Sequence, residues 1–185
     1  MSITINADEA VKHITMCFQL GLVPMLKSSP GTGKSDIYKQ IANKYNLKLI
    51  DLRLSQCDST DLNGFPMLNG DKAKYKPLDI FPLDTDPEPI GYKGWLLFLD
   101  EINSAPLSVQ AASYKLALDR MVGSNKLHPK VAIGCAGNLS TDGAIVNRLS
   151  TAMQSRLIHY ELSVDWQVWS NWASTNKLAM EVISY

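Results

Sequence analysis

Apolar residues along the chain form short continuous runs that alternate with stretches of helical spacing. The clearest runs lie at 22–26, 95–99 and 131–136, and each is followed by a glycine-rich or polar segment. A strand with alternating apolar and polar residues is predicted at 47–54, and another strand is predicted at 157–162. Continuous apolar runs of this length are typical of strands that are buried on both faces of a parallel sheet.

Helical spacing predicts a helix at 8–20, before the first of these strands, and helices at 34–45 and 106–121 between later strands. A short helix is expected around 143–149, and the segment 164–185, with three of the four tryptophans, is expected to be helical. Strands separated by helices favour an α/β fold with a mostly parallel sheet covered on both faces. In such sheets, ligands bind beyond the carboxyl ends of the strands.

The stretch 55–94 interrupts this alternation because it is rich in Pro, Gly, Asp and Asn. Within it, the residues around Asn69-Gly70 predict a β-hairpin that turns at this dipeptide. A loop of this length inside a compact domain is usually functional.

Composition limits the function classes. The 18 basic residues balance 18 acidic residues, so net charge does not favour nucleic acid or an anionic membrane. The first residues carry no secretory signal pattern, and no apolar run approaches the roughly 18 residues that span a membrane. Three scattered cysteines and three scattered histidines fit neither a disulfide framework nor a zinc site. We therefore expect a cytoplasmic protein.

A glycine-rich segment between the run at 22–26 and the helix at 34–45 has phosphate-binding character. It is a Walker A sequence in which Ser28 stands at the position of the first glycine. Glycines let backbone N–H groups turn toward a phosphate, and the following helix adds partial positive charge. The predicted phosphate-binding residues are Ser29, Pro30, Gly31, Thr32, Gly33, Lys34 and Ser35. The alternative is a glycine-rich helix start without a ligand, but the preceding strand and the following helix are the context that a phosphate loop requires.

Within this segment, Lys34 supplies an ammonium group for β- and γ-phosphate oxygens, and the Ser35 hydroxyl can bind Mg²⁺. The run at 95–99 ends at Asp100 and Glu101, as in a Walker B motif. We expect Asp100 to orient the magnesium shell and Glu101 to activate the water that attacks the γ-phosphate. The alternative is a charged pair at an exposed strand end. It is disfavoured because adjacent carboxylates on a buried strand repel each other unless a cation is present.

Three further residues are candidates for the reaction. Asn138 ends the next apolar strand, where a neutral amide can hold the attacking water or a phosphate oxygen; the alternative is an Asn that favours a turn. Arg148 and Arg156 are candidates for an arginine finger that reaches the γ-phosphate of a neighbouring subunit. Arg156 is favoured because it lies at the start of the last strand, and the alternative for both is a surface ion pair.

This order of motifs resembles the AAA+ superfamily, and specifically the MoxR-like ATPases of bacteria and their phages. The resemblance covers about 20–175. It rests on 52–56 (LRLSQ), 61–66 (DLNGFP), 98–103 (FLDEIN) with 105–106 and 109–112, 136–138 (AGN) and 154–157 (QSRL).

The resemblance implies a P-loop NTPase core with a five-stranded sheet at 1–163, ATP and Mg²⁺ as ligands, and a homo-oligomeric ring, typically a hexamer. It also implies remodelling of a protein client, often with a von Willebrand factor A-domain partner, and a hairpin-like insertion at 63–82. The segment 164–185 resembles the beginning of a helical lid, so the chain reads as truncated and no sensor-2 arginine can be named.

Three functions stay open at this point. The first is an ATP-driven remodeller of a protein client, and the second is a nucleic-acid motor or loader, which neutral charge disfavours. The third is a nucleotide-gated scaffold without catalysis, which would need neither Glu101 nor Asn138. No base-reading motif separates ATP from GTP.

Overall fold

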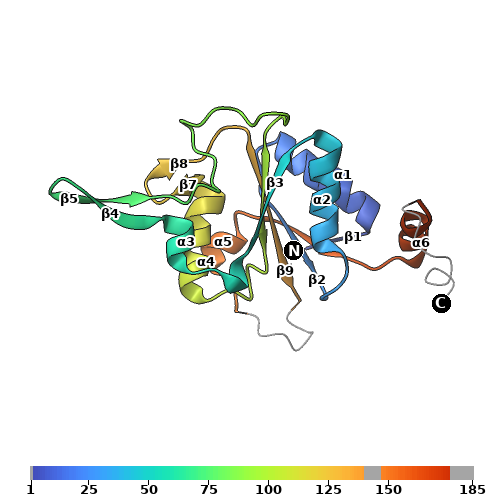
Figure 1. The fold of residues 1–185 in the computed structure, drawn as a ribbon. Helices are drawn as coiled ribbons and strands as arrows, with labels where there is room; N and C mark the ends of the chain where they lie inside the picture. The colour runs from blue at the N-terminus through green and yellow to red at the C-terminus, as the bar shows by residue number, and fades with distance from the viewer. Residues whose placement is uncertain (1, 140–146, 176–185) are drawn as a thin grey trace.

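A six-stranded sheet forms the centre of the computed structural model, which describes residues 2–139 and 147–175 (Figure 1). Its order is β1-β10-β2-β9-β6-β3, and every neighbouring pair is parallel. The strands are β1 Ile3–Ile5, β2 Pro24–Ser28, β3 Lys48–Arg53, β6 Trp95–Asp100, β9 Val131–Asn138 and β10 Ile158–Leu162.

The expected count of five strands is wrong by one. The sixth strand, β1, has three residues and pairs with β10 at the edge of the sheet. A segment this short carries no hydrophobic period, so the pattern of apolar residues did not indicate it.

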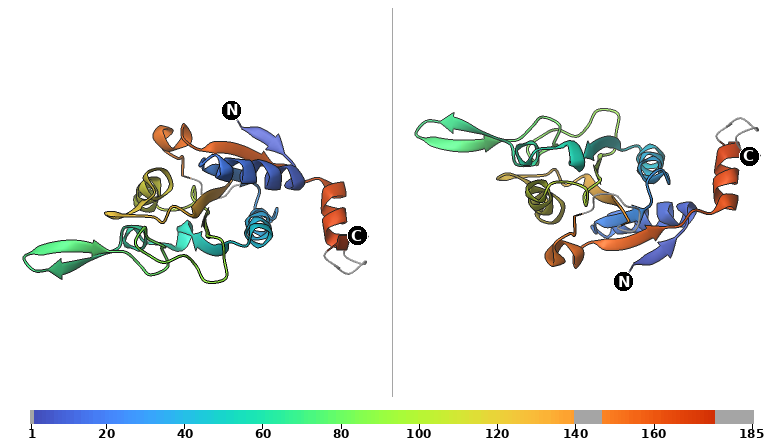
Figure 2. Two further views of the ribbon diagram at one scale, coloured as in Figure 1. Left: turned by 90° about the horizontal axis from the view of Figure 1, so that it is seen from above. Right: turned by 90° about the horizontal axis from the view of Figure 1, so that it is seen from below.

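Helices cover both faces of the sheet, as Figure 2 shows from above and below. Helices α1 (Ala7–Gln19) and α2 (Lys34–Tyr45) pack on one face, in a hydrophobic cluster that includes Leu96 and Phe98 of β6. The other face, with Leu97 and Leu99 of β6, is covered by shorter elements. These are the 3₁₀ turn Leu54–Gln56, α3 Ser59–Asn63, α4 Leu107–Tyr114 and α5 Thr151–Gln154. Both faces of β6 are therefore buried, as its continuous apolar run predicted.

The helix expected at 106–121 is shorter in the structure. Helix α4 passes into a π-helical turn at Lys115–Asp119, and Arg120, with φ of 55°, ends it. A small hairpin of β7 (Met121–Val122) and β8 (Asn125–Lys126) follows.

Two expected helices lie partly outside the described residues. Of the helix expected around 143–149, residues 143–146 are not described, and 147–150 have no regular structure. The segment 164–185 contains α6, Trp166–Thr175, and residues 176–185 are not described. No helix in the described ranges has the length and apolar character needed to cross a membrane.

The predicted hairpin is present and projects from the body of the molecule (Figures 1 and 2). Strands β4 (Phe65–Asn69) and β5 (Lys72–Lys76) pair antiparallel, and all ten of their residues are exposed. The two-residue loop is Gly70-Asp71, one residue beyond the expected turn, and Gly70 has φ of 65°.

Candidate nucleotide-binding site

The glycine-rich segment connects β2 to the start of α2, at the carboxyl edge of the sheet. Gly31 and Gly33 have φ of 77° and 87°, in the left-handed region that favours glycine. No atom outside their neighbours lies within 4 Å of the position that a Cβ would take at either residue. The loop is therefore curled and open, and Gly33 directs it into the N-terminus of α2, where backbone N–H groups favour an anion.

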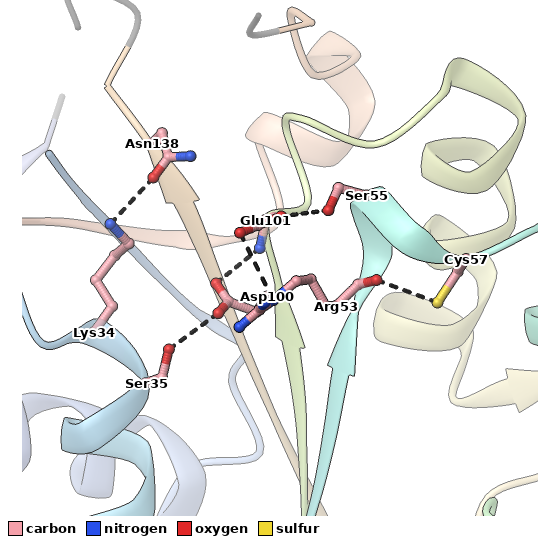
Figure 3. Close-up of polar contacts among 8 residues, drawn as sticks. All are labelled: Lys34, Ser35, Arg53, Ser55, Cys57, Asp100, Glu101 and Asn138. Carbon is pink, nitrogen blue, oxygen red and sulfur yellow. Dashed lines mark hydrogen bonds and ion pairs between the residues drawn. The ribbon is translucent and has the colours of Figure 1, made fainter. Parts of the chain in front are cut away.

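Lys34 folds back into this loop and is only 8% exposed. Its Nζ donates hydrogen bonds to Ser28 O (3.1 Å), Ser28 Oγ (3.0 Å) and Ser29 O (3.0 Å). A fourth acceptor, Asn138 Oδ1 on β9, lies 3.2 Å from Nζ, so the three N–H groups are shared among four oxygens (Figure 3). The ammonium group thus lies between the phosphate loop and the end of the neighbouring strand.

Ser28, which replaces the first glycine of the motif, is fully buried. Besides accepting from Lys34, its hydroxyl is hydrogen-bonded to Thr32 Oγ1, which in turn donates to Ser29 O at 2.9 Å. The substitution therefore adds a side-chain acceptor inside the loop.

Ser35 and Asp100 connect the phosphate loop to β6. Ser35 Oγ donates to Asp100 Oδ2 at 3.0 Å, and Asp100 Oδ1 accepts from the backbone N–H of Glu101 at 2.8 Å (Figure 3). Asp100 is 6% exposed. A hydroxyl and one carboxylate suit Mg²⁺, which binds few protein oxygens and keeps water and phosphate ligands. Within the described part of the chain, no group of three or more His, Cys, Asp or Glu residues could hold a metal.

The Glu101 side chain is held by two residues at and just after the end of β3, Arg53 and Ser55. The φ of Glu101, 55°, is unusual for a residue with a side chain and turns the chain sharply after β6. Arg53 Nε lies 3.7 Å from Glu101 Oε1, and Ser55 Oγ donates to Glu101 Oε2 (Figure 3). Arg53 is the strand partner of Asp100, so a protein cation lies beside the two carboxylates.

Sequence reasoning assigned no role to Arg53 or Ser55. Their position at the end of β3 could have indicated a role, because parallel strands end at the same edge of a sheet. Asp51 on β3 also has a shifted pKa. Burial raises the pKa of its carboxyl group, and the charge of Asp100 raises it further, whereas the charges of Lys39 and Arg53 lower it.

Asn138 lies where it was expected, at the end of β9. Because β9 separates β2 from β6, Asn138 lies between the phosphate loop and the carboxylates, level with Ser28. Its backbone is bonded to Asn103, a buried residue that sequence reasoning did not select.

Arg156 lies far from the phosphate loop of its own chain. It precedes β10, whose first residue, Ile158, is level with Pro24 at the start of β2. The loop follows the other end of β2, about 13 Å away at about 3.3 Å per residue. The exposed Arg156 side chain donates to Tyr114 OH, and its guanidinium carbon lies 5.7 Å from the centre of that ring.

Arg148 is also exposed, and the residue before it is held at the carboxyl edge of the sheet. The preceding residue, Asn147, donates from its backbone N–H to Asn103 O at 2.7 Å and from Nδ2 to Ala105 O at 2.9 Å. Neither arginine is hydrogen-bonded or ion-paired to Asp100 or Glu101.

A cavity of about 500 Å³ adjoins the phosphate loop. Its lining includes Pro30–Gly33, Asp36 and Gln40 on one side and Trp166, Trp169 and Trp172 of α6 on the other. Trp166 and Trp169 stack with ring centres 5.1 Å apart. A flat apolar group attached to a phosphate chain would fit such a cavity.

Comparisons with known proteins relate this chain to others by fold. No protein-family model matches the chain, and no curated protein matches it in sequence. Its fold is similar to that of a crystal structure described as a "putative ATPase" from Cytophaga hutchinsonii, with a TM-score of 0.65 and 14% identity. The match covers 95% of this chain and 52% of that chain, so this chain spans about half the length of that protein.

Proposed function

We propose that the chain binds ATP together with Mg²⁺ at the carboxyl edge of its sheet and hydrolyses the γ-phosphate. The observation that carries this proposal is the meeting of four side chains at that edge. Lys34 is bonded to Asn138, and Ser35 is bonded to Asp100, although these residues come from three different strand ends. A purely structural helix start would not need a buried lysine, a carboxylate and an amide around one glycine-rich loop.

Each side chain has a role that follows from its position. Lys34 exchanges its loop acceptors for phosphate oxygens, and backbone N–H groups at the start of α2 surround the same phosphates. Ser35 and Asp100 would hold Mg²⁺, which would neutralise charge on the phosphate oxygens. Glu101 accepts the proton of the attacking water, and Asn138 orients that water or a phosphate oxygen.

The cavity beside the loop suits the base of the nucleotide. Its three tryptophans offer flat faces on which a purine can stack, and stacking does not distinguish adenine from guanine. The same aromatic side chains provide a fluorescence signal for nucleotide binding.

At a finer level, we propose a MoxR-like AAA+ ATPase core that assembles into a ring and remodels a protein client. The motif order supports the family, and α6 follows the last strand, where the resemblance leads us to expect a first lid helix. The projecting hairpin supports a protein partner, because Phe65, Met67, Leu68 and Tyr75 are 48–87% exposed on it. A von Willebrand factor A-domain protein is the expected type of partner.

A nucleic-acid motor is the second candidate, and one observation favours it. Lys72, Lys74 and Lys76 alternate along β5 and therefore lie on one face of the exposed hairpin. Such a row can contact phosphates, but the chain as a whole is neutral.

Phosphate release from ATP tests the proposal and separates the two candidates. We expect hydrolysis that requires Mg²⁺ and is unchanged by single- or double-stranded DNA. Stimulation by DNA that disappears when the three hairpin lysines are replaced by glutamine would favour the motor. Absence of both ATP binding and turnover would contradict the proposed function.

A further inference from the structure

Asn103 is a buried amide that the proposed reaction has not used. It lies two residues after Glu101 and is 5% exposed. Its Nδ2 donates to Asn138 O at 2.7 Å, and its Oδ1 accepts from Asn138 N at 3.0 Å. One side chain therefore satisfies both backbone groups of Asn138.

This amide takes the place of a missing strand partner. The pairing of β6 with β9 ends at Leu99 and Cys135, three residues before β9 itself ends. Beyond that point, Ile102 N donates to Ala136 O at 3.0 Å, and the Asn103 side chain provides the next two bonds. Without the Asn103 side chain, Asn138 would lose both of its backbone hydrogen bonds on the β6 side.

Gly137 provides independent evidence for this arrangement. A Cβ at residue 137 would lie 2.4 Å from Asn103 Oδ1 and 2.7 Å from Met25 Cε. The absence of a side chain at this position thus makes room for the amide, and any larger residue would push against it.

The backbone of Asn103 is used as well. Its carbonyl oxygen accepts from Asn147 N at 2.7 Å, so the loop after β6 also fixes the residue that precedes Arg148. The end of β9, the carboxylate loop and this later segment therefore meet at one residue.

We propose that Asn103 is a positioning residue of the nucleotide site, which rests on the function proposed above. It fixes the end of β9 so that Asn138 Oδ1 faces Lys34, and it acts through Asn138 without touching the substrate. Loss of the Asn103 side chain leaves the phosphate loop intact, so it should reduce turnover rather than ATP affinity.

Two variants test this role. Asn103→Leu keeps the approximate shape and removes both bonds, whereas Asn103→Asp keeps the acceptor and replaces the donor with a second acceptor. We expect kcat to fall by about tenfold or more in each, because a lost bond to a buried group has about this effect. The ATP dissociation constant should stay within about twofold, since Lys34 and the loop provide the phosphate contacts. Asn43→Asp, at an exposed position of α2, is the matched control.

A double-mutant comparison and an exchange measurement complete the test. Asn103→Leu and Asn138→Ala should not be additive in kcat, because both act through the same amide. Amide hydrogen exchange at Asn138 should accelerate in Asn103→Leu and in Gly137→Ala, with the unfolding temperature reported for each variant. Unchanged exchange at Asn138, or additive losses of kcat, would overturn the proposal. The exchange measurement needs no turnover, so it still tests the role of Asn103 if the parent chain fails to hydrolyse ATP.

Discussion

Ser35 Oγ donates a hydrogen bond to Asp100 Oδ2 at 3.0 Å, although the strands that lead to these residues, β2 and β6, are not neighbours. The intervening strand, β9, ends in Asn138, so three strand ends contribute to one polar site. A hydroxyl and a carboxylate at this distance can share a cation or its bound water.

Removing either group should weaken the use of Mg²⁺. Ser35→Ala and Asp100→Asn should each raise the Mg²⁺ concentration for half-maximal ATP turnover by about 10- to 100-fold, as the loss of residues around a metal does elsewhere. Titration of turnover with Mg²⁺ measures the change. Asp71→Asn, in the exposed loop of the hairpin, is the control, and an equal effect in this variant would contradict a specific role for Ser35 and Asp100.

Lys34→Ala should lose affinity for ATP. The variant removes a charged donor, and such hydrogen bonds are worth about 1.5–3 kcal/mol each, so binding should weaken by roughly 10- to 100-fold. Tryptophan fluorescence and calorimetric titration with Mg²⁺ and ATP measure it. Lys39→Ala, on the exposed side of the same helix, should bind like the parent chain. Unchanged affinity in Lys34→Ala would contradict the proposal that this segment binds the phosphates of ATP.

Ser55→Ala should increase turnover. Ser55 and Arg53 each occupy one carboxylate oxygen of Glu101, and the carboxylate must release one of them to accept a proton from water. Loss of one hydrogen bond of ordinary strength should raise kcat by about two- to tenfold. Steady-state kinetics at saturating ATP measure this, with Ser59→Ala as the control. A fall in kcat would instead show that Ser55 aligns the base.

Arg156→Ala should spare ATP binding and depress turnover in assembled protein. The proposed role is that of an arginine finger acting on a neighbouring subunit, and such fingers are worth about 10³–10⁵ in rate. Mixing Arg156→Ala chains with Glu101→Gln chains should restore part of the activity. In a mixed assembly, an Arg156→Ala chain keeps its own Glu101 and receives Arg156 from a neighbouring Glu101→Gln chain. If no mixing ratio restores activity, the finger assignment is wrong, and Arg148→Ala is tested in the same way.

Much of the site could be predicted from the sequence because parallel strands end at one edge of a sheet. This rule alone brings the phosphate loop, Asp100 and Asn138 together. It does not give the strand order, so the place of Asn138 between the other two groups emerged only from the structure.

The residues that sequence reasoning missed act through contacts that no local pattern encodes. Asn103 bonds to a backbone 35 residues away, and Ser55 bonds to a carboxylate 46 residues away. Strand β1 was missed for another reason, since three residues are too few to display a period. Hydrophobic periodicity thus predicts elements and their ends, whereas side-chain contacts between loops depend on the folded arrangement.

ATP turnover by the parent chain beside Glu101→Gln tests the central claim most directly. The amide has the shape of the acid but cannot accept a proton, and positioned general bases contribute about 10²–10⁴ in rate. We predict that the parent hydrolyses ATP and that Glu101→Gln binds ATP with similar affinity but releases phosphate at least about 100-fold more slowly. Equal rates in the two proteins would contradict the assignment of Glu101. ATP binding without turnover in either protein would identify a nucleotide-gated scaffold instead of an ATPase.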